Sequence, residues 1–240
     1  MNDVFVSALG AGASELGLTL SPEQLQMCYN YAQKVRQWNE KINLTTLVDL
    51  EEMAIKHFVD SFTGTLAGTW PKGALCADVG TGAGFPGVPM AILRPDTKWV
   101  LIDSLGKRVN FLRQAIAEIG LLGVTSVHAR AEEVGRGKKM REKYDIVVAR
   151  AVAQLSVLAE YCLPLVRPGG YFIAMKGPGA SDEVAAAKKA LAILGGGPPK
   201  LIELTLPQQA GQRTLVSVYK KTSTPAAYPR RPGIPGKKPL

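Results

Sequence analysis

The hydrophobic and polar positions of the chain follow one period before about residue 70 and another after it. Residues 22–38 place apolar side chains every three or four positions, which predicts an amphipathic helix. A second helix is predicted over residues 49–62, DLEEMAIKHFVDSF. Both begin with a capping-box pattern, at Ser21 and Gln24 and at Asp49 and Glu52. We therefore expect a helical extension over residues 1–70.

Between residues 71 and 221 the pattern changes to short β-rich runs separated by helical runs. The clearest helices are predicted at 108–121 and 155–166, and strands are predicted at 74–79, 98–103, 124–129, 144–149, 170–176, 201–206 and 214–220. Such alternation is typical of a parallel sheet with helices on both faces. The segment PQQAGQR between the last two strands is too short for a helical crossover, so these strands are predicted to pair antiparallel.

Residues 222–240 have neither period and are rich in Pro and Gly, which predicts an arm that is extended or disordered until something binds it. The formal net charge is +9, and six basic residues lie near this end without an acid among them: Lys220, Lys221, Arg230, Arg231, Lys237 and Lys238. Such a patch suits a polyanion, and nucleic acid is the commonest one in a cytoplasm.

Several classes of protein are disfavoured by the composition. No stretch approaches the roughly 20 apolar residues of a membrane-spanning helix, and the first residues lack the basic start and apolar core of a signal peptide. Cys28, Cys76 and Cys162 are far apart in apolar contexts, so they predict buried side chains. His57 and His128 are single histidines with a structural role expected. We expect a cytoplasmic protein without a metal site.

The stretch DVGTGAGFPGVP, residues 78–89, places a glycine-rich loop between the first strand of the sheet and a helix that begins near Pro86. Gly82, Gly84 and Gly87 spell the G-x-G-x-x-G pattern of dinucleotide-binding proteins. That fingerprint should begin where the strand ends, at Gly80, and counting from there puts Phe85 in the place of the third glycine. The loop therefore predicts a ligand close to the backbone and disfavours a pyrophosphate.

Two carboxylates flank this loop in the predicted sheet. Asp103 ends the second strand and is placed to accept hydrogen bonds from both hydroxyls of an adenosine ribose, which NAD and S-adenosylmethionine share. Asp78 either belongs to the same ligand site or holds the amides of the glycine loop, and the sequence favours neither role. The run LPLVRPGGYFIAMKG and the antiparallel hairpin after it look like the class I methyltransferase fold, a Rossmann-like, seven-stranded, mostly parallel sheet with an antiparallel last strand.

The ends of the third and fourth strands are expected to complete this site. Ala131 and Glu132 are placed to contact an adenine ring and its amine, although a surface salt bridge explains Glu132 equally well. Arg150 ends an apolar strand, where an unpaired cation is costly, so it is expected to meet a carboxylate or the methyl acceptor.

The choice of methyl acceptor is narrowed by residues that are missing. The Asn/Asp-Pro-Pro-aromatic turn that serves exocyclic amines is replaced by residues 149–152, Ala-Arg-Ala-Val. Cys162 lies inside a predicted helix and is a poor nucleophile for cytosine C5. Lys176 ends strand five as methylation of a ribose oxygen would require. That reaction also needs an acid at the end of strand four, and this position is occupied by Arg150 instead. Guanine N7 fits because it carries no proton, so no catalytic acid or base is required.

Several motifs resemble one bacterial family. DVGTGAGFPGVPMAI, LIDSLGKRVNFL, RAEE, DIVVARAVAQL, MKG and the tail YPRRPGIPGKKPL resemble the small-subunit rRNA guanine-N7 methyltransferases RsmG, also called GidB, and the likeness extends from about residue 38 to 240. The resemblance implies S-adenosylmethionine-dependent methylation of N7 of a guanine in 16S rRNA, position 527 in conventional rRNA numbering. It also implies cofactor contacts at Gly80, Gly82, Phe85, Asp103, Ala131, Glu132 and Arg150.

The same resemblance suggests where the 16S rRNA or the small ribosomal subunit would bind. Basic residues expected to face RNA are Lys107, Arg108, Lys176, Arg230, Arg231, Lys237 and Lys238. A solvated helix end explains Lys107 and Arg108 equally well. Loss of the residues after Thr222 is then expected to weaken RNA binding while cofactor affinity is kept. Three divisions are expected: the extension at 1–70, a methyltransferase domain at 71–221 and the arm at 222–240, in a monomer.

Other functions remain open from the residues alone. A small-molecule methyltransferase would leave the basic arm without a purpose. An RNA-binding or ribosome-assembly module with a vestigial cofactor pocket would use the arm but transfer no methyl group. A dehydrogenase is the least favoured, because the glycine loop is out of register with the dinucleotide fingerprint.

Overall fold

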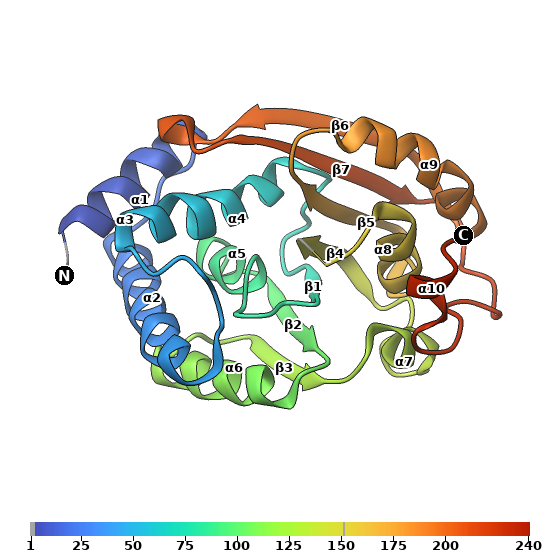
Figure 1. The fold of residues 1–240 in the computed structure, drawn as a ribbon, viewed down its shortest axis with the longest axis horizontal. Coiled ribbons are helices and arrows are strands. Elements are labelled where there is room, and N and C mark those ends of the chain that lie inside the picture. The colour runs from blue at the N-terminus through green and yellow to red at the C-terminus, as the bar shows by residue number, and fades with distance from the viewer. Residues whose placement is uncertain (1–2, 151) are drawn as a thin grey trace.

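A seven-stranded sheet forms the centre of the computed structural model, which describes residues 3–150 and 152–240 (Figure 1). Met1, Asn2 and Ala151 lie outside the described residues. The strands are β1 (Leu75–Val79), β2 (Lys98–Asp103), β3 (Val124–His128), β4 (Tyr144–Arg150), β5 (Val166–Lys176), β6 (Gly196–Thr205) and β7 (Gln212–Lys220). Their order is β3-β2-β1-β4-β5-β7-β6, and only β7 runs antiparallel to its neighbours β5 and β6. The fold class predicted from the sequence is confirmed.

Helices cover both faces of the sheet, as right-handed crossovers between parallel strands require (Figure 1). One apolar core includes side chains of α1 (Asp3–Glu15), α2 (Pro22–Ile42), α5 (Gly87–Leu93) and α6 (Gly106–Glu118). The other includes side chains of α7 (Ala131–Arg136), α8 (Leu155–Cys162) and α9 (Ala180–Ile193). The three cysteines are free and buried, as expected.

The predicted N-terminal helices are present, with one irregularity that matters for the site. The capping box of Ser21 and Gln24 starts α2, and the Asp49 side chain accepts a hydrogen bond from the backbone N–H of Glu52. The second predicted helix is divided into α3 (Leu50–Met53), a π-helical turn η1 (Ala54–Val59), α4 (Asp60–Thr63) and a 3-10 turn η2 (Gly64–Leu66). Single π-helical turns inside helices are frequent at functional sites.

Some elements differ from those expected. Helices α7 and α9 were not among the predicted helices, because α7 is only 6 residues long and the small alanine side chains of α9 give it a weak apolar pattern. Strand β5 begins at Val166 and includes the Pro-Gly-Gly sequence that was expected to precede it. The connection between β6 and β7 is a short 3-10 turn, η3 (Pro207–Gln209), in agreement with an antiparallel hairpin.

The expectation of an extended or disordered C-terminal arm is wrong. Residues 222–240 fold back beside α7 and α8 and end in a short helix, α10 (Ile234–Lys237) (Figure 1). Lys220, one of the six basic residues noted above, is 0% exposed. Its buried ammonium group donates to the carbonyl oxygens of Leu163 and Leu194. The sequence pattern missed this because the arm is held by polar contacts with distant residues.

Candidate functional site

The glycine-rich loop joins β1 to α5 and approaches its neighbours too closely for larger side chains. Gly80 has φ +73°, and a Cβ atom there would lie 2.7 Å from a methyl group of Val152. The buried Asp78 carboxylate accepts hydrogen bonds from the Thr81 hydroxyl at 2.7 Å and from the Gly87 N–H at 2.8 Å. Burial raises the pKa of Asp78 to about 6. Asp78 therefore holds the glycine loop in place, which is one of the two roles considered for it.

A pocket lies where this loop meets the ends of β2 and β3, and we call it the β1–β2 pocket. It has a volume of about 150 Å³ and is lined by Val79, Gly80, Ile102, Asp103, Ser104, Ala129, Arg130, Ala131, Glu132, Val152, Tyr161 and Gly233. The carboxyl ends of parallel strands are where open α/β sheets bind ligands. The position therefore agrees with the site that the glycine loop predicted.

Asp103 is the buried carboxylate on the strand side of this pocket, at 3% exposure. Its Oδ2 accepts the Gly82 N–H at 2.9 Å, and its Oδ1 accepts the Leu105 N–H at 2.8 Å. Arg108 places its guanidinium 3.7 Å from Oδ2. Each carboxylate oxygen can accept more than one hydrogen bond, so the group retains acceptor capacity for a ligand. Its contacts fix the carboxylate against the glycine loop.

Glu132 is the second buried carboxylate of the β1–β2 pocket, at 4% exposure. It lies in α7, one residue after Ala131, as the sequence places it. Its Oε1 accepts a hydrogen bond at 2.9 Å from the backbone N–H of Gly233 in the C-terminal arm. The contact excludes the surface salt bridge considered for Glu132 and brings the arm to the edge of the pocket.

A second hollow lies at the ends of β4 and β5, and we call it the β4–β5 cavity. It has a volume of about 480 Å³ and is lined by Lys56, His57, Asp60, Arg150, Met175, Lys176, Gly177, Glu183 and Arg213. Arg150 and Lys176 come from the strand ends, and Lys56, His57 and Asp60 come from the π-helical turn and the residue after it. The N-terminal helices thus provide one wall of this cavity.

Asp60 joins two arginines at the base of the β4–β5 cavity. Its Oδ2 accepts from Arg150 at 3.0 Å, and its Oδ1 accepts from Arg213 of β7 at 2.9 Å. The Asp60 side chain is 5% exposed and that of Arg150 is 14% exposed. Burial lowers the pKa of Arg150, and the adjacent carboxylate opposes that shift. One carboxylate for two cations leaves the cavity with an excess of positive charge.

Phe85 lies between two of these residues. Its ring stacks on that of His57 with centroids 4.5 Å apart, and the Arg150 guanidinium lies 5.5 Å from the same ring. His57 shares a 2.8 Å hydrogen bond with the Thr45 hydroxyl. Burial and the nearby Arg150 lower the pKa of His57 to about 3, so the ring is neutral at physiological pH. Only a structural role was expected for His57, but the structure places it in the wall of the cavity.

The predicted cofactor residues divide between the two hollows. Gly80, Asp103, Ala131 and Glu132 line the β1–β2 pocket, and the Gly82 amide is bonded to Asp103 beside it. Arg150 lines the β4–β5 cavity, and Phe85 contacts it from below the glycine loop. Arg150 was expected to meet a carboxylate or the acceptor, and the structure pairs it with Asp60.

The residues expected to face RNA are also divided. Lys107, Arg231, Lys237 and Lys238 are exposed. Lys176 instead turns toward the β4–β5 cavity, where it donates to the Ala153 carbonyl and pairs with Glu183, both at 2.7 Å. Arg230 pairs with the buried Glu160 at 2.6 Å and its side chain is 26% exposed, so its contact with RNA stays a prediction. The sequence does not distinguish a solvent-exposed basic side chain from one that is paired inside the fold.

Asp60 and Arg213 are the site residues that the sequence analysis missed. A weak signal was present for Asp60, the only acid in the run AIKHFVDSF, three positions after His57. Arg213 lies 153 positions from Asp60 in the sequence, and nothing local indicates that the two meet.

Comparison with known proteins decides the family. The family model GidB, described as rRNA small subunit methyltransferase G, matches residues 24–213. The chain belongs to this family. Proteins named ribosomal RNA small subunit methyltransferase G are 45% identical over all of both chains in Desulforamulus reducens and 49% identical over 95% of this chain and 96% of the relative in Lactobacillus delbrueckii subsp. bulgaricus. The resemblance inferred from the motifs is confirmed, and with it the assignment as a methyltransferase.

Solved structures share the fold of this family member at low identity. Precorrin-6y C5,15-methyltransferase from Geobacter metallireducens has a TM-score of 0.51 at 13% identity, over 75% of this chain and 92% of that one. A SAM-dependent methyltransferase from Aquifex aeolicus has a TM-score of 0.50 at 16% identity, over 78% and 97%. These structures support the Rossmann-like methyltransferase fold.

Two further searches concern only residues 3–150 and 152–240. Within them, no helix is long and apolar enough to cross a membrane. The same part of the chain holds no group of three or more His, Cys, Asp or Glu side chains arranged to bind a metal ion.

Proposed function

We propose that the protein transfers a methyl group from S-adenosylmethionine to N7 of one guanine in 16S rRNA. The observation that carries the proposal is the pair of buried carboxylates in the β1–β2 pocket, Asp103 and Glu132, beside the bare backbone of Gly80. Carboxylates accept hydrogen bonds from neutral hydroxyl and amine groups, which an adenosine presents at its two ends. The family membership supports the same reaction.

The chain's own residues fit such a cofactor. Asp103 would accept from the ribose hydroxyls, and Ala131 and Glu132 would meet the adenine, with Gly80 and Gly82 leaving room for the amino-acid part. A Cβ atom at Gly80 would collide with Val152, whereas the space beside Gly82 is open. When bound, S-adenosylmethionine supplies a methyl group on a positively charged sulfur.

The acceptor base would enter the β4–β5 cavity, which lies at the adjacent strand ends and is large enough for a small ligand. Arg150 lines it with its guanidinium 5.5 Å from the Phe85 ring, and Lys56 and Arg213 bring further positive charge for the surrounding phosphates. Guanine N7 has a free lone pair, so the residues need only orient the base and exclude water. The neutral His57 agrees with a site that moves no proton.

The substrate that we propose is the guanine at position 527, in 16S rRNA or the small ribosomal subunit, met by a monomer in the cytoplasm. Lys107, Arg231, Lys237 and Lys238 are the exposed cations best placed to contact phosphates. Arg108 contributes less in this role, since it faces Asp103.

The direct test uses labelled S-adenosylmethionine and three substrates from cells lacking this protein: naked 16S rRNA, an assembly intermediate and the 30S subunit. We expect label at N7 of a single guanine, mapped by reverse transcription after cleavage at the modified base. The Asp103→Ala variant should transfer no detectable label. Cofactor binding without transfer to any of the three substrates would favour an RNA-binding module with a vestigial pocket instead.

A further inference from the structure

The C-terminal arm contacts Glu132, the carboxylate of the β1–β2 pocket that is placed for the adenine amine. The Gly233 N–H donates to Glu132 Oε1 at 2.9 Å, and Gly233 itself lines the pocket. The bond leaves Oε2 of Glu132 as the second acceptor of the carboxylate. A buried carboxylate with one oxygen held in this way has a fixed orientation.

An ion pair fixes this part of the arm to the body of the protein. Arg230 donates from Nε and Nη2 to the Glu160 carboxylate, at 2.9 Å and 2.6 Å, and its backbone N–H donates to the same carboxylate at 2.7 Å. The Glu160 side chain is 1% exposed. Paired, fork-like arginine contacts are both strong and specific in geometry. Arg230 therefore fixes the backbone three residues before Gly233.

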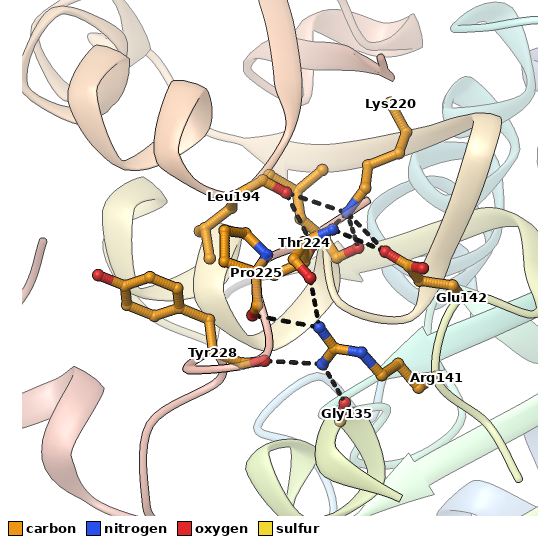
Figure 2. A network of polar contacts seen from close by, with 9 residues as sticks. Gly135, Arg141, Glu142, Leu194, Lys220, Thr224, Pro225 and Tyr228 are labelled. Carbon is orange, nitrogen blue, oxygen red and sulfur yellow. Dashed lines mark hydrogen bonds and ion pairs between the residues drawn. The ribbon is translucent and has the colours of Figure 1, made fainter. Parts of the chain in front are cut away.

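A second polar network holds the beginning of the arm, as Figure 2 shows. Arg141 donates to the carbonyl oxygens of Thr224 at 2.6 Å and Tyr228 at 2.7 Å. The Thr224 N–H donates to Glu142 at 2.7 Å, and the buried Lys220 ammonium also donates to the Thr224 hydroxyl. These contacts join the arm to the segment between α7 and β4 and to the end of β7.

The next residue in the arm provides a contrast. Arg231 is exposed and Arg230 is half-buried, although the two are adjacent in the sequence and carry the same charge. A role of the arm in RNA binding alone would make both arginines face outward. The inward direction of Arg230 requires another explanation.

We propose that the C-terminal arm is a wall of the cofactor pocket, in which Arg230 is a positioning residue that acts through Gly233 on Glu132. This inference rests on the proposed function, because it assumes that adenine meets Glu132. It changes the expectation for loss of the arm: truncation after Thr222 now lowers cofactor affinity as well as RNA affinity.

The test measures binding of S-adenosylhomocysteine by calorimetry without RNA, in the full-length protein and in Arg230→Ala. We expect Arg230→Ala to bind about tenfold more weakly, which corresponds to about 1.4 kcal/mol. The matched control is Arg231→Ala, which should bind as the wild type does. Arg230→Lys keeps the charge but not the paired contact, so it should lie between the two.

A second readout separates positioning from a general loss of structure. S-inosylhomocysteine carries an oxygen in place of the adenine amine, so the wild type should bind it more weakly than S-adenosylhomocysteine. Arg230→Ala should lose most of this preference, because Glu132 is no longer held. A melting curve establishes that each variant is folded, and if Arg230→Ala is unfolded then Arg230→Lys decides the question by the same two measurements.

Several outcomes would overturn the inference. Wild-type affinity and wild-type base preference in a folded Arg230 variant would show that the arm does not organise the pocket. Tighter binding after truncation would show that the arm blocks the pocket instead. Failure of the wild-type protein to bind S-adenosylhomocysteine would count against the proposed function itself, which is a different result.

Discussion

The β1–β2 pocket and the β4–β5 cavity lie at neighbouring strand ends of one sheet, but they are built from opposite charges. The first has two buried carboxylates, each held by backbone N–H groups. The second has a single buried carboxylate, Asp60, between two arginines. Backbone amides hold an acceptor toward a neutral nucleoside, whereas surplus arginine charge suits a polyanion. The two hollows therefore differ in the charge of their buried groups although they lie at one edge of the sheet.

The two hollows also depend on different parts of the chain. The N-terminal extension forms a wall of the β4–β5 cavity through the π-helical turn, and the C-terminal arm reaches the β1–β2 pocket through Gly233. Both additions lie outside the strands and helices of the sheet itself. Substitutions in each hollow should therefore have separable effects.

The largest effect is expected in the β4–β5 cavity. Asp60→Ala leaves Arg150 and Arg213 without their shared carboxylate, and loss of one partner of a buried ion pair costs about 3–5 kcal/mol. We expect a loss near the lower end of that range in the free energy of unfolding, measured with urea. The control is Asp96→Ala, which removes a half-exposed pair with Arg94 and should cost no more than about 1 kcal/mol. Equal losses in both variants would contradict a buried network.

The next effect concerns the β1–β2 pocket. Asp103→Ala removes the proposed ribose acceptor and the bonds to the Gly82 and Leu105 amides, so S-adenosylhomocysteine should bind about a hundredfold more weakly, or about 2.7 kcal/mol. Asp103→Asn keeps one acceptor oxygen and should lose less. Calorimetry measures the affinity of both variants for S-adenosylhomocysteine. Their affinity for RNA, measured without cofactor, should stay unchanged. Near-normal cofactor binding would remove Asp103 from the site.

A pH-dependent effect on stability is expected from His57, which lines the β4–β5 cavity but not the β1–β2 pocket. The pKa of His57 is about 3 in the folded protein and near 6.5 when exposed, so the unfolded chain binds an extra proton between these values. Stability should therefore fall as pH decreases from 6.5 toward 3, with about 1.4 kcal/mol per pH unit from this group. His57→Gln should reduce the slope, measured by urea unfolding at several pH values. An unchanged slope would show that His57 is not buried as a neutral ring.

The smallest effect is expected at the surface of the arm. Replacing Arg231, Lys237 and Lys238 together by alanine should weaken RNA binding. The slope of log affinity against log salt concentration should also become shallower, by the amount that corresponds to up to about three phosphate contacts. Cofactor affinity without RNA should stay as in the wild type. The control replaces the exposed Lys188 and Lys189 of α9. The same change in salt dependence in both variants would indicate only a general charge effect.

The fold was largely predictable from the sequence, because hydrophobic periods and short linkers act locally. The strands, the hairpin and the glycine loop follow from residues close together in the chain. Gly80, Asp103 and Glu132 were predicted for one site because parallel strands end at one edge of the sheet. The structure brings these three residues together as expected.

The rest depended on pairing between distant residues. Asp60 meets Arg213 across 153 positions, and Arg230 meets Glu160 across 70. A charged residue gives the same sequence signal whether it is solvated or paired, so the tail was predicted to be disordered and Arg230 to face RNA. The π-helical turn was missed because its backbone hydrogen bonds span only one residue more than those of an α-helix, so the sequence pattern still predicts one continuous helix.

The opposite directions of Arg230 and Arg231 have a consequence for how the two ligands influence each other. A coupling free energy between two sites acts equally in both directions. If the seated arm favours the cofactor by some factor, then the cofactor stabilises the seated arm by the same factor. The outward charges of Arg231, Lys237 and Lys238 are then presented in one arrangement when the methyl donor is bound. Because the contact is with the adenine side of the pocket, S-adenosylmethionine and S-adenosylhomocysteine should stabilise the seated arm alike.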